Sequence, residues 1–317
     1  MESAMLEYQS RMIDSRALNE LPDHSGQQRQ ADVEFFAEPP AEIGKVISAE
    51  STLRPGRQAM PFPTRLLIGA VIGGGLVYGG YWLGRNAAEI DRQGFQIMGW
   101  ILGTAALGIT LLVTRFKVIC TFVGEAGTAN FTLKGGRYKQ PKLQLLRFAE
   151  AEELRAKQTR HYVNGVYTGT HYDYTWTGPG GQRLLRAKGS YRQRKKGLKA
   201  GEPFRFLQAS EFAWSDHYLE RANKLLKTEG SIPFRVDKSR VVRVGPGFLE
   251  FHFGGEPMRL TQEDIASVSL GNGTFQFKHK DTKWYSLSGR YSFMYGNMAN
   301  ARVFLLALEK LMGYRWN

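Results

Sequence analysis

The sequence predicts an α+β protein in which a two-helix transmembrane hairpin is followed by two tandem β-rich units, each closed by a C-terminal helix. Three observations support this class. Two uncharged apolar runs of 19 residues lie close together, strand-like alternating runs between glycine turns fill the rest, and an amphipathic segment ends each strand-rich stretch. We therefore expect a tail at 1–62, the hairpin at 63–115, a first unit at 116–232 and a second at 233–317.

The first 62 residues are predicted to form a disordered cytoplasmic tail. They are rich in Gln, Glu, Pro and Ser, and two pairs of helix breakers, Pro39 with Pro40 and Pro55 with Gly56, interrupt regular structure. A short amphipathic helix over 2–21 is the alternative, because several apolar residues recur there.

The two apolar runs, 66–84 and 95–113, contain no Asp, Glu, Lys, Arg or His. At 1.5 Å per residue, each makes a helix of roughly 28 Å, about the thickness of a hydrocarbon core. The link 85–94 is polar, and basic residues flank both runs. A pair of buried helices in a soluble protein is the alternative, but such helices are usually shorter or polar on one side. The pattern favours two membrane spans.

Glycines recur at four-residue spacing within the predicted spans. Small residues let helix backbones approach closely in lipid, so they predict packing between the two helices or oligomerisation through a second glycine face. The residues assigned to this packing are Gly69, Gly73, Gly75, Gly79, Gly99 and Gly103, and a further pair, Gly80 and Gly84, continues the spacing. With no ionisable group inside either span, the hairpin offers no path for an ion or proton.

Charge predicts where the chain lies. The formal net charge is +14, and residues 114–317 hold 34 Lys/Arg against 17 Asp/Glu. A basic region tied to a bilayer most simply faces an anionic leaflet, and a short link holds both ends of a hairpin on one side. We expect a multi-pass protein of the cell inner membrane with both termini cytoplasmic. The single cysteine, Cys120, excludes an intramolecular disulfide and fits a reducing compartment.

The strand-rich stretches read as two similar units. Each has glycine-turn hairpins followed by one amphipathic helix, which suggests an internal repeat, although chance similarity of two β-rich segments is the alternative. A segment at 150–158 has a helical composition. The expected hairpins are 117–133 and 172–188 in the first unit and 240–253 and 274–288 in the second, and the expected helices are 212–227 and 297–312.

The second unit resembles the pleckstrin-homology superfold, whose strand-rich domain is closed by one C-terminal helix. The resemblance covers about 240–313 and is strongest at 259–270 (RLTQEDIASVSL), at the strand that follows it and at the final helix. Bacterial membrane-anchored members of that superfold often follow a pair of transmembrane helices. The resemblance implies a binding or scaffolding role and transfers no binding residue.

Positive charge gathers most densely in the first unit. Eight basic residues fall within 17 positions that contain no acid, which predicts a patch for phosphate groups of anionic lipid. An ordinary solvated loop is the alternative, and nucleic acid is the weaker candidate ligand. The residues are Arg183, Arg186, Lys188, Arg192, Arg194, Lys195, Lys196 and Lys199.

No catalytic signature is present. The sequence lacks nucleophile-elbow, zinc-protease and phosphate-loop motifs, and its six histidines have no metal-ligand spacing. We expect no enzyme activity, metal or cofactor. The predicted function is a non-enzymatic integral membrane protein whose basic cytoplasmic region binds anionic lipid or a protein partner at the inner leaflet. The alternative is a structural subunit, or a homo-oligomer, assembled through the glycine-rich helices.

Overall fold

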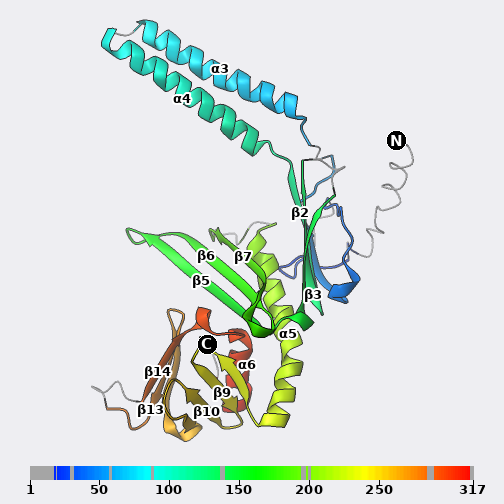
Figure 1. Cartoon of the computed structure of the whole chain (residues 1–317), viewed down its shortest axis with the longest axis vertical. Helices are drawn as coiled ribbons and strands as arrows, with labels where there is room; N and C mark the ends of the chain where they lie inside the picture. Colours follow the sequence, from blue (N-terminus) through cyan, green and yellow to red (C-terminus); the bar gives the residue numbers. More distant parts are fainter. Residues whose placement is uncertain are drawn as a thin grey trace.

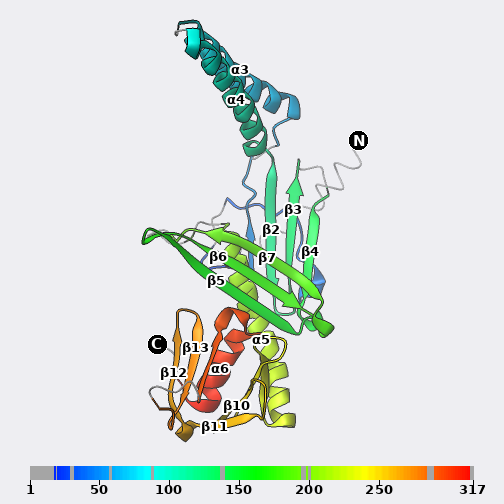
Figure 2. The ribbon, with the colours of Figure 1, turned by 60° about the vertical axis from the view of Figure 1, so that its left-hand side comes forward.

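The computed structural model describes residues 18, 20–28, 32–56, 59–86, 89–135, 140–193, 198, 201–283 and 289–314. It has the expected α+β class, with two apolar helices, several antiparallel sheets and a C-terminal helix (Figure 1). The two apolar helices project away from the strand-rich part of the molecule in Figures 1 and 2.

The helices α3 (Phe62–Asn86) and α4 (Glu89–Val113) pack side by side as a hairpin. Both are long and apolar enough to span a membrane, and most of their side chains lie outside any protein core. Val71 is 67% exposed and Leu112 is 70% exposed, which is costly in water and favourable in lipid. This exposure argues against the soluble alternative of two buried core helices.

The first sheet corrects the expectation of a disordered tail. Its order is β1-β2-β3-β4, and its strands are β1 (Val46–Ser51), β2 (Lys117–Gly124), β3 (Gly127–Lys134) and β4 (Lys142–Arg147). Ile43 and Ala49 are fully buried against this sheet. The tail composition is misleading because the partner of β1 lies beyond both apolar helices, and that distant partner supplies the hydrogen bonds and apolar contacts.

The second sheet has the order β5-β6-β7 and is followed by a long helix. The segment 150–158, expected to be helical, is instead largely β5, because Leu154 and Ala156 alternate into the core and pair with β6. The closing helix begins with Pro203 and ends at Glu229, and the capping residue Gly230 that follows has a φ of 69°. The elements are β5 (Glu153–Val163), β6 (Val166–Thr177), β7 (Arg183–Tyr191) and α5 (Pro203–Glu229).

The C-terminal part contains a four-stranded sheet, β11-β10-β9-β8, and a three-stranded sheet, β12-β13-β14. The pairing of β13 differs from expectation, because β13 pairs with β12 and β14. The sequence predicts a partner strand at 283–288 instead. Residue 283 is not in a strand, and 284–288 lie outside the described residues. The elements are β8 (Ile232–Arg235), β9 (Val241–Gly245), β10 (Phe248–His252), β11 (Met258–Thr261), β12 (Ile265–Gly271), β13 (Thr274–His279), β14 (Arg290–Met294) and α6 (Ala301–Met312).

One hydrophobic core continues from the second sheet through α5 into the C-terminal sheets and α6. Asn300, just before α6, joins these parts. Its Oδ1 accepts hydrogen bonds from the Trp214 indole and the Leu154 backbone N–H, both at 2.9 Å, and its Nδ2 donates to the Glu152 carbonyl at 3.1 Å. These contacts fix the second sheet relative to the C-terminal part of the molecule.

Candidate functional site

The exposed face of the β5-β6-β7 sheet is the candidate site. Alternate residues such as Tyr174 and Trp176 point into the core, so the residues between them lie on the opposite face. Strand pairing places Lys157 opposite Asp173, and Asp173 opposite Lys188. Two lysines from the outer strands therefore flank one aspartate on the central strand.

The next row along the same face is formed by Thr159, His171 and Ser190. The His161 and His171 rings lie with their centroids 4.1 Å apart. Two adjoining hollows share His161, His171 and Ser190, and Arg192 lines the second hollow. Imidazole, hydroxyl and ammonium groups all donate hydrogen bonds to phosphate oxygens, so this row suits an anionic ligand.

Asp173 does not cancel the positive charge of the two lysines, because Arg186 already binds it. Arg186 Nε donates to Asp173 Oδ1 at 2.9 Å, and its Nη2 contacts Oδ2. The hydrogen bond from Arg186 holds the pKa of Asp173 below its usual value, so this carboxyl stays ionised and paired. Lys157, Lys188 and Arg192 form no ion pair among the residues that the structure describes. Three cations on this face are thus available to a ligand.

The structure places the predicted basic residues unevenly. Arg186 and Lys188 lie on the exposed face, and Arg192 lies at its edge. Arg183 pairs with Thr177 at the opposite end of β7 and is separated from the hollows. Arg194, Lys195, Lys196 and Lys199 lie outside the described residues.

Sequence reasoning missed Lys157, His161 and Ser190. They belong to the site only because of the strand register of β5, which occupies most of a segment whose composition predicts a helix. Period-two alternation from Leu154 to Lys157 was the available signal. Within the described part of the chain, no group of three or more His, Cys, Asp or Glu side chains is arranged to hold a metal.

Four of the six glycines assigned to helix packing lie at the contact between α3 and α4. A Cβ placed on Gly73 would come 2.6 Å from the Gly103 carbonyl oxygen, and one on Gly69 would come 2.6 Å from Leu107. Gly80 and Gly99 approach similarly, with a Cβ on Gly99 only 3.0 Å from the Gly80 Cα. The two backbones touch along much of the hairpin.

Gly75 and Gly79 do not take part in this contact. A Cβ on either would have no neighbour within 4 Å in the described part of the chain, so they lie on another face of α3. The physical reason is the helical turn of about 100° per residue, which places Gly75 some 200° around the helix from Gly73. Four-residue spacing identifies a glycine face but does not say which face meets the partner helix.

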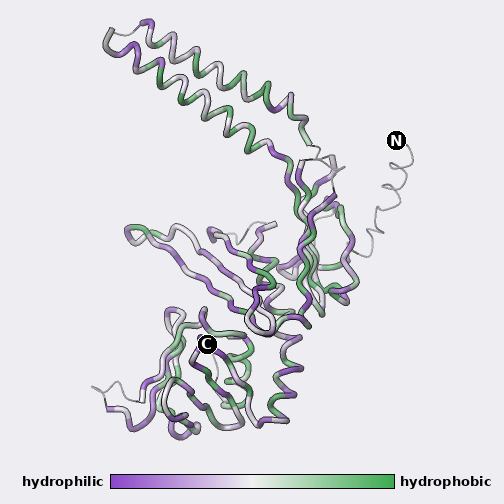
Figure 3. The backbone as a smooth tube through the Cα atoms, viewed as in Figure 1, coloured by the Kyte–Doolittle hydropathy of each residue, from purple (hydrophilic) through white to green (hydrophobic). Residues whose placement is uncertain are grey.

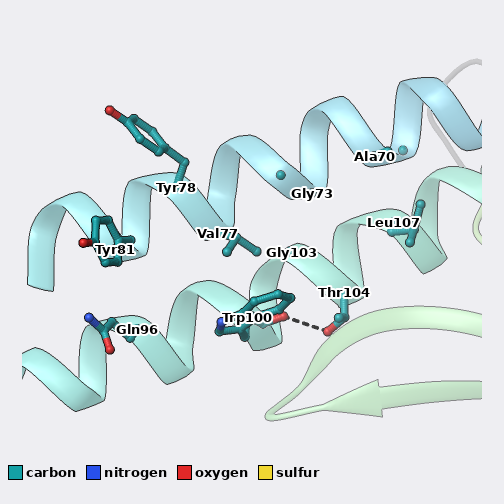
Figure 4. Close-up of a pocket in the computed structure, with 12 residues that line it drawn as sticks. Ala70, Gly73, Val77, Tyr78, Tyr81, Gln96, Trp100, Gly103, Thr104 and Leu107 are labelled. Atoms are coloured by element: carbon teal, nitrogen blue, oxygen red, sulfur yellow. Dashed lines mark hydrogen bonds between the residues drawn. The ribbon is translucent and has the colours of Figure 1, made fainter.

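A hollow runs beside the interhelical contact and opens to the outside of the hairpin (Figure 4). Tyr78 and Tyr81 line it from α3, and Gln96 and Trp100 line it from α4. The Thr104 hydroxyl donates to the Trp100 carbonyl at 2.8 Å, which satisfies this polar group within its own helix. Most of the residues that line the hollow are apolar or glycine, and the polar groups of Tyr78, Tyr81 and Gln96 lie toward one end.

Comparison with known proteins adds no relative: no protein-family model and no curated protein matches this chain.

Proposed function

We propose that this chain is a non-enzymatic integral membrane protein whose β5-β6-β7 face binds the phosphate headgroups of anionic lipids. The observation that carries the proposal is the gathering of Lys157, Lys188 and Arg192 on one exposed sheet face, beside an aspartate that Arg186 neutralises. Each basic residue close to an anionic leaflet contributes about 1 kcal/mol, so three contribute about 3 kcal/mol at moderate salt.

Strand pairing supports a single-sided arrangement. Residues before α3 form β1 and residues after α4 form β2, and these strands are paired. If α3 and α4 cross a bilayer, both flanking regions must therefore remain on one side. The excess of Lys and Arg in 114–317 favours the cytoplasmic side, and we place both termini there, at the cell inner membrane.

We further propose that the strands form two tandem pleckstrin-homology-like units. Four strands, three strands and a helix follow one another in β1–β7 with α5, and the same order recurs in β8–β14 with α6. The β5–β6 hairpin and the β12–β13 hairpin also share Asn-Gly turns, at Asn164 and at Asn272. In this arrangement the transmembrane hairpin is inserted between the first two strands of the first unit, rather than preceding the unit.

The test uses the full chain in mild detergent, with native mass spectrometry of bound phosphatidylglycerol and phosphatidylcholine. The double variant Lys157→Gln/Lys188→Gln should bind phosphatidylglycerol about thirtyfold more weakly, from the loss of two charges near the headgroup. Lys224→Gln/Lys227→Gln removes the same charge from the exposed end of α5 and should bind like the parent. Equal binding by all three proteins would reject the proposal.

A structural role in a larger membrane complex is the second candidate. The observation that favours it is the open face of α3, where a Cβ on Gly75 or Gly79 would meet no described residue within 4 Å. A transmembrane helix of another subunit would fit this face closely. Stoichiometric co-purification of a partner, lost in Gly75→Leu/Gly79→Leu, would favour this role; a chain that purifies alone in both forms would not.

A further inference from the structure

The β5–β6 hairpin extends beyond the sheet as a two-stranded arm. The third strand, β7, pairs with β6 only from Thr170 to Thr177, so among the described residues no third strand lies beside the outer part of the hairpin. The corresponding hairpin in the C-terminal part is shorter: β5 and β6 have 11 and 12 residues, against 7 and 6 in β12 and β13. Four more residues in β5 lengthen the arm by about 13 Å.

The tip of this arm is apolar and exposed. Asn164 and Gly165 form the turn, with φ angles of 50° and 77°, which matches a tight two-residue hairpin turn. Val163 pairs with Val166 across the turn and Tyr162 pairs with Tyr167. Tyr162, Val163 and Val166 are 57%, 59% and 62% exposed. Figure 3 shows the tip in hydrophobic colour at the end of a largely hydrophilic arm.

The turn does not require these apolar side chains. The second Asn-Gly turn, at Asn272 and Gly273, is flanked by Gly271 and Thr274 instead. Because one chain builds the same turn with a glycine and a threonine, the valines at the first turn are not explained by hairpin geometry.

Positive charge surrounds the base of the arm. The sequence has no Asp or Glu from 154 to 172, while Arg155, Lys157 and Arg160 lie in β5. The Gln193 backbone N–H donates to the Tyr167 hydroxyl at 3.4 Å, and the neighbouring Arg192 lines a hollow with His161 and Thr168 of the arm. An apolar tip with basic flanks is the pattern of surfaces that enter the interfacial layer of an anionic bilayer.

We propose that the tip formed by Tyr162, Val163 and Val166 inserts into the interfacial layer of the bilayer that α3 and α4 span. Figures 1 and 2 both show the arm reaching toward the side to which the α3–α4 hairpin leans. The inference rests on the proposed membrane-bound function. It adds an apolar contact that orients the basic face toward the headgroups, so the cytoplasmic region lies against the membrane.

The test places an environment-sensitive fluorophore at Val166→Cys in the full chain, reconstituted in nanodiscs with brominated or ordinary lipid chains. Cys120 is fully buried and stays unlabelled. Bromine should quench the tip fluorophore about twofold or more, because the label lies at the level of the upper acyl chains. The matched control is Thr274→Cys, which follows the equivalent Asn-Gly turn and should show no such quenching.

Two further experiments distinguish insertion of the tip from the alternatives. A Val163→Asp change beside the label should abolish the quenching, because a charged tip resists entry into lipid. Nanodiscs of phosphatidylcholine alone remove the headgroup charge. Quenching there, without selective binding of phosphatidylglycerol, would support insertion while rejecting the headgroup proposal. Equal, weak quenching at both labelled sites in every bilayer would overturn insertion and would point to a protein partner for the tip.

Discussion

Ala49 lies directly opposite Phe122 in the first sheet, although the whole α3–α4 hairpin separates them along the chain. Both side chains are fully buried, in a core that also holds Ile43 and Cys120. The hairpin is therefore held at both ends by one folded sheet. Arg65 closes it further, since its Nε donates to the Thr114 hydroxyl at 3.0 Å. If α3 and α4 cross a bilayer, this arrangement keeps the residues before α3 and after α4 on the same side.

Cysteine substitutions at Lys45 and Glu256 should lie on one side of the membrane, and one at Arg85 should lie on the other side. Lys45 directly precedes β1, and Glu256 lies between β10 and β11 in the C-terminal part. Arg85 lies at the end of α3 that is far from the sheets. An impermeant thiol reagent outside intact cells should label Arg85→Cys and should reach Lys45→Cys and Glu256→Cys only after lysis. Labelling of Lys45→Cys and Arg85→Cys from the same side would contradict a transmembrane hairpin.

Gly73→Leu and Gly103→Leu should each destabilise the hairpin. A Cβ at either position comes 2.6 Å from a backbone oxygen of the other helix, so the helices must move apart. The expected cost is about 1–3 kcal/mol, seen as a lower melting temperature in detergent. Gly75→Leu is the matched control and should leave the monomer unchanged, because its face is open. Equal melting of all three variants would mean that the helices do not pack at Gly73.

Asn300→Ala should destabilise the junction between the second sheet and α6. The change leaves the Trp214 indole and the Leu154 N–H without their acceptor, at a cost of about 2–4 kcal/mol. Urea unfolding followed by tryptophan fluorescence measures it. Asn300 also has a φ of 55°, so Asn272→Ala, at a φ of 51° in an exposed turn, controls for backbone strain. Similar losses in both variants would assign the effect to strain alone.

Glu211→Gln should stabilise the protein near neutral pH. Glu211 on α5 accepts a hydrogen bond from Tyr174 at 3.1 Å, and burial raises the pKa of its carboxyl above the usual 4.5. A carboxyl with a raised folded pKa binds its proton more tightly in the folded state. Its ionisation therefore costs stability as the pH rises from 4.5 through the folded pKa.

The difference between Glu211→Gln and the parent should accordingly disappear in acid, where the carboxyl is protonated in both folded and unfolded chains. Urea unfolding at a series of pH values measures this difference. Glu309→Gln, on the exposed side of α6, is the control. A constant difference between Glu211→Gln and the parent at all pH values would show that packing, and not charge, is responsible.

The hairpin was predictable because its signal is local. Composition alone defines a span, and the predicted run 66–84 falls inside α3. The strand β1 was not predictable in this way, because its partner β2 follows the second apolar helix. In β5, residues with good helix propensity such as Glu153 and Leu154 gave the wrong element, and pairing with β6 overrode that propensity.

Part of the candidate site was also predictable from a local signal in the sequence. Arg186 and Lys188 are neighbours in sequence and could be recognised as a cluster. Lys157 joins them only through Asp173 on the strand between, so register decides its position. The glycines of α3 also show the limit of a local pattern. Four-residue spacing identifies Gly73 and Gly75 equally, and only the packing of α3 against α4 distinguishes them.

If the chain functions as proposed, the β5-β6-β7 face lies against anionic headgroups. Lysine acetylation of the full chain in nanodiscs, read by mass spectrometry, tests it most directly, because Lys157 and Lys188 are exposed on that face. Both should react several-fold more slowly in phosphatidylglycerol-containing nanodiscs than in phosphatidylcholine nanodiscs, while Lys224 and Lys227 react equally in the two. Equal reactivity of all four lysines in both bilayers would contradict the claim.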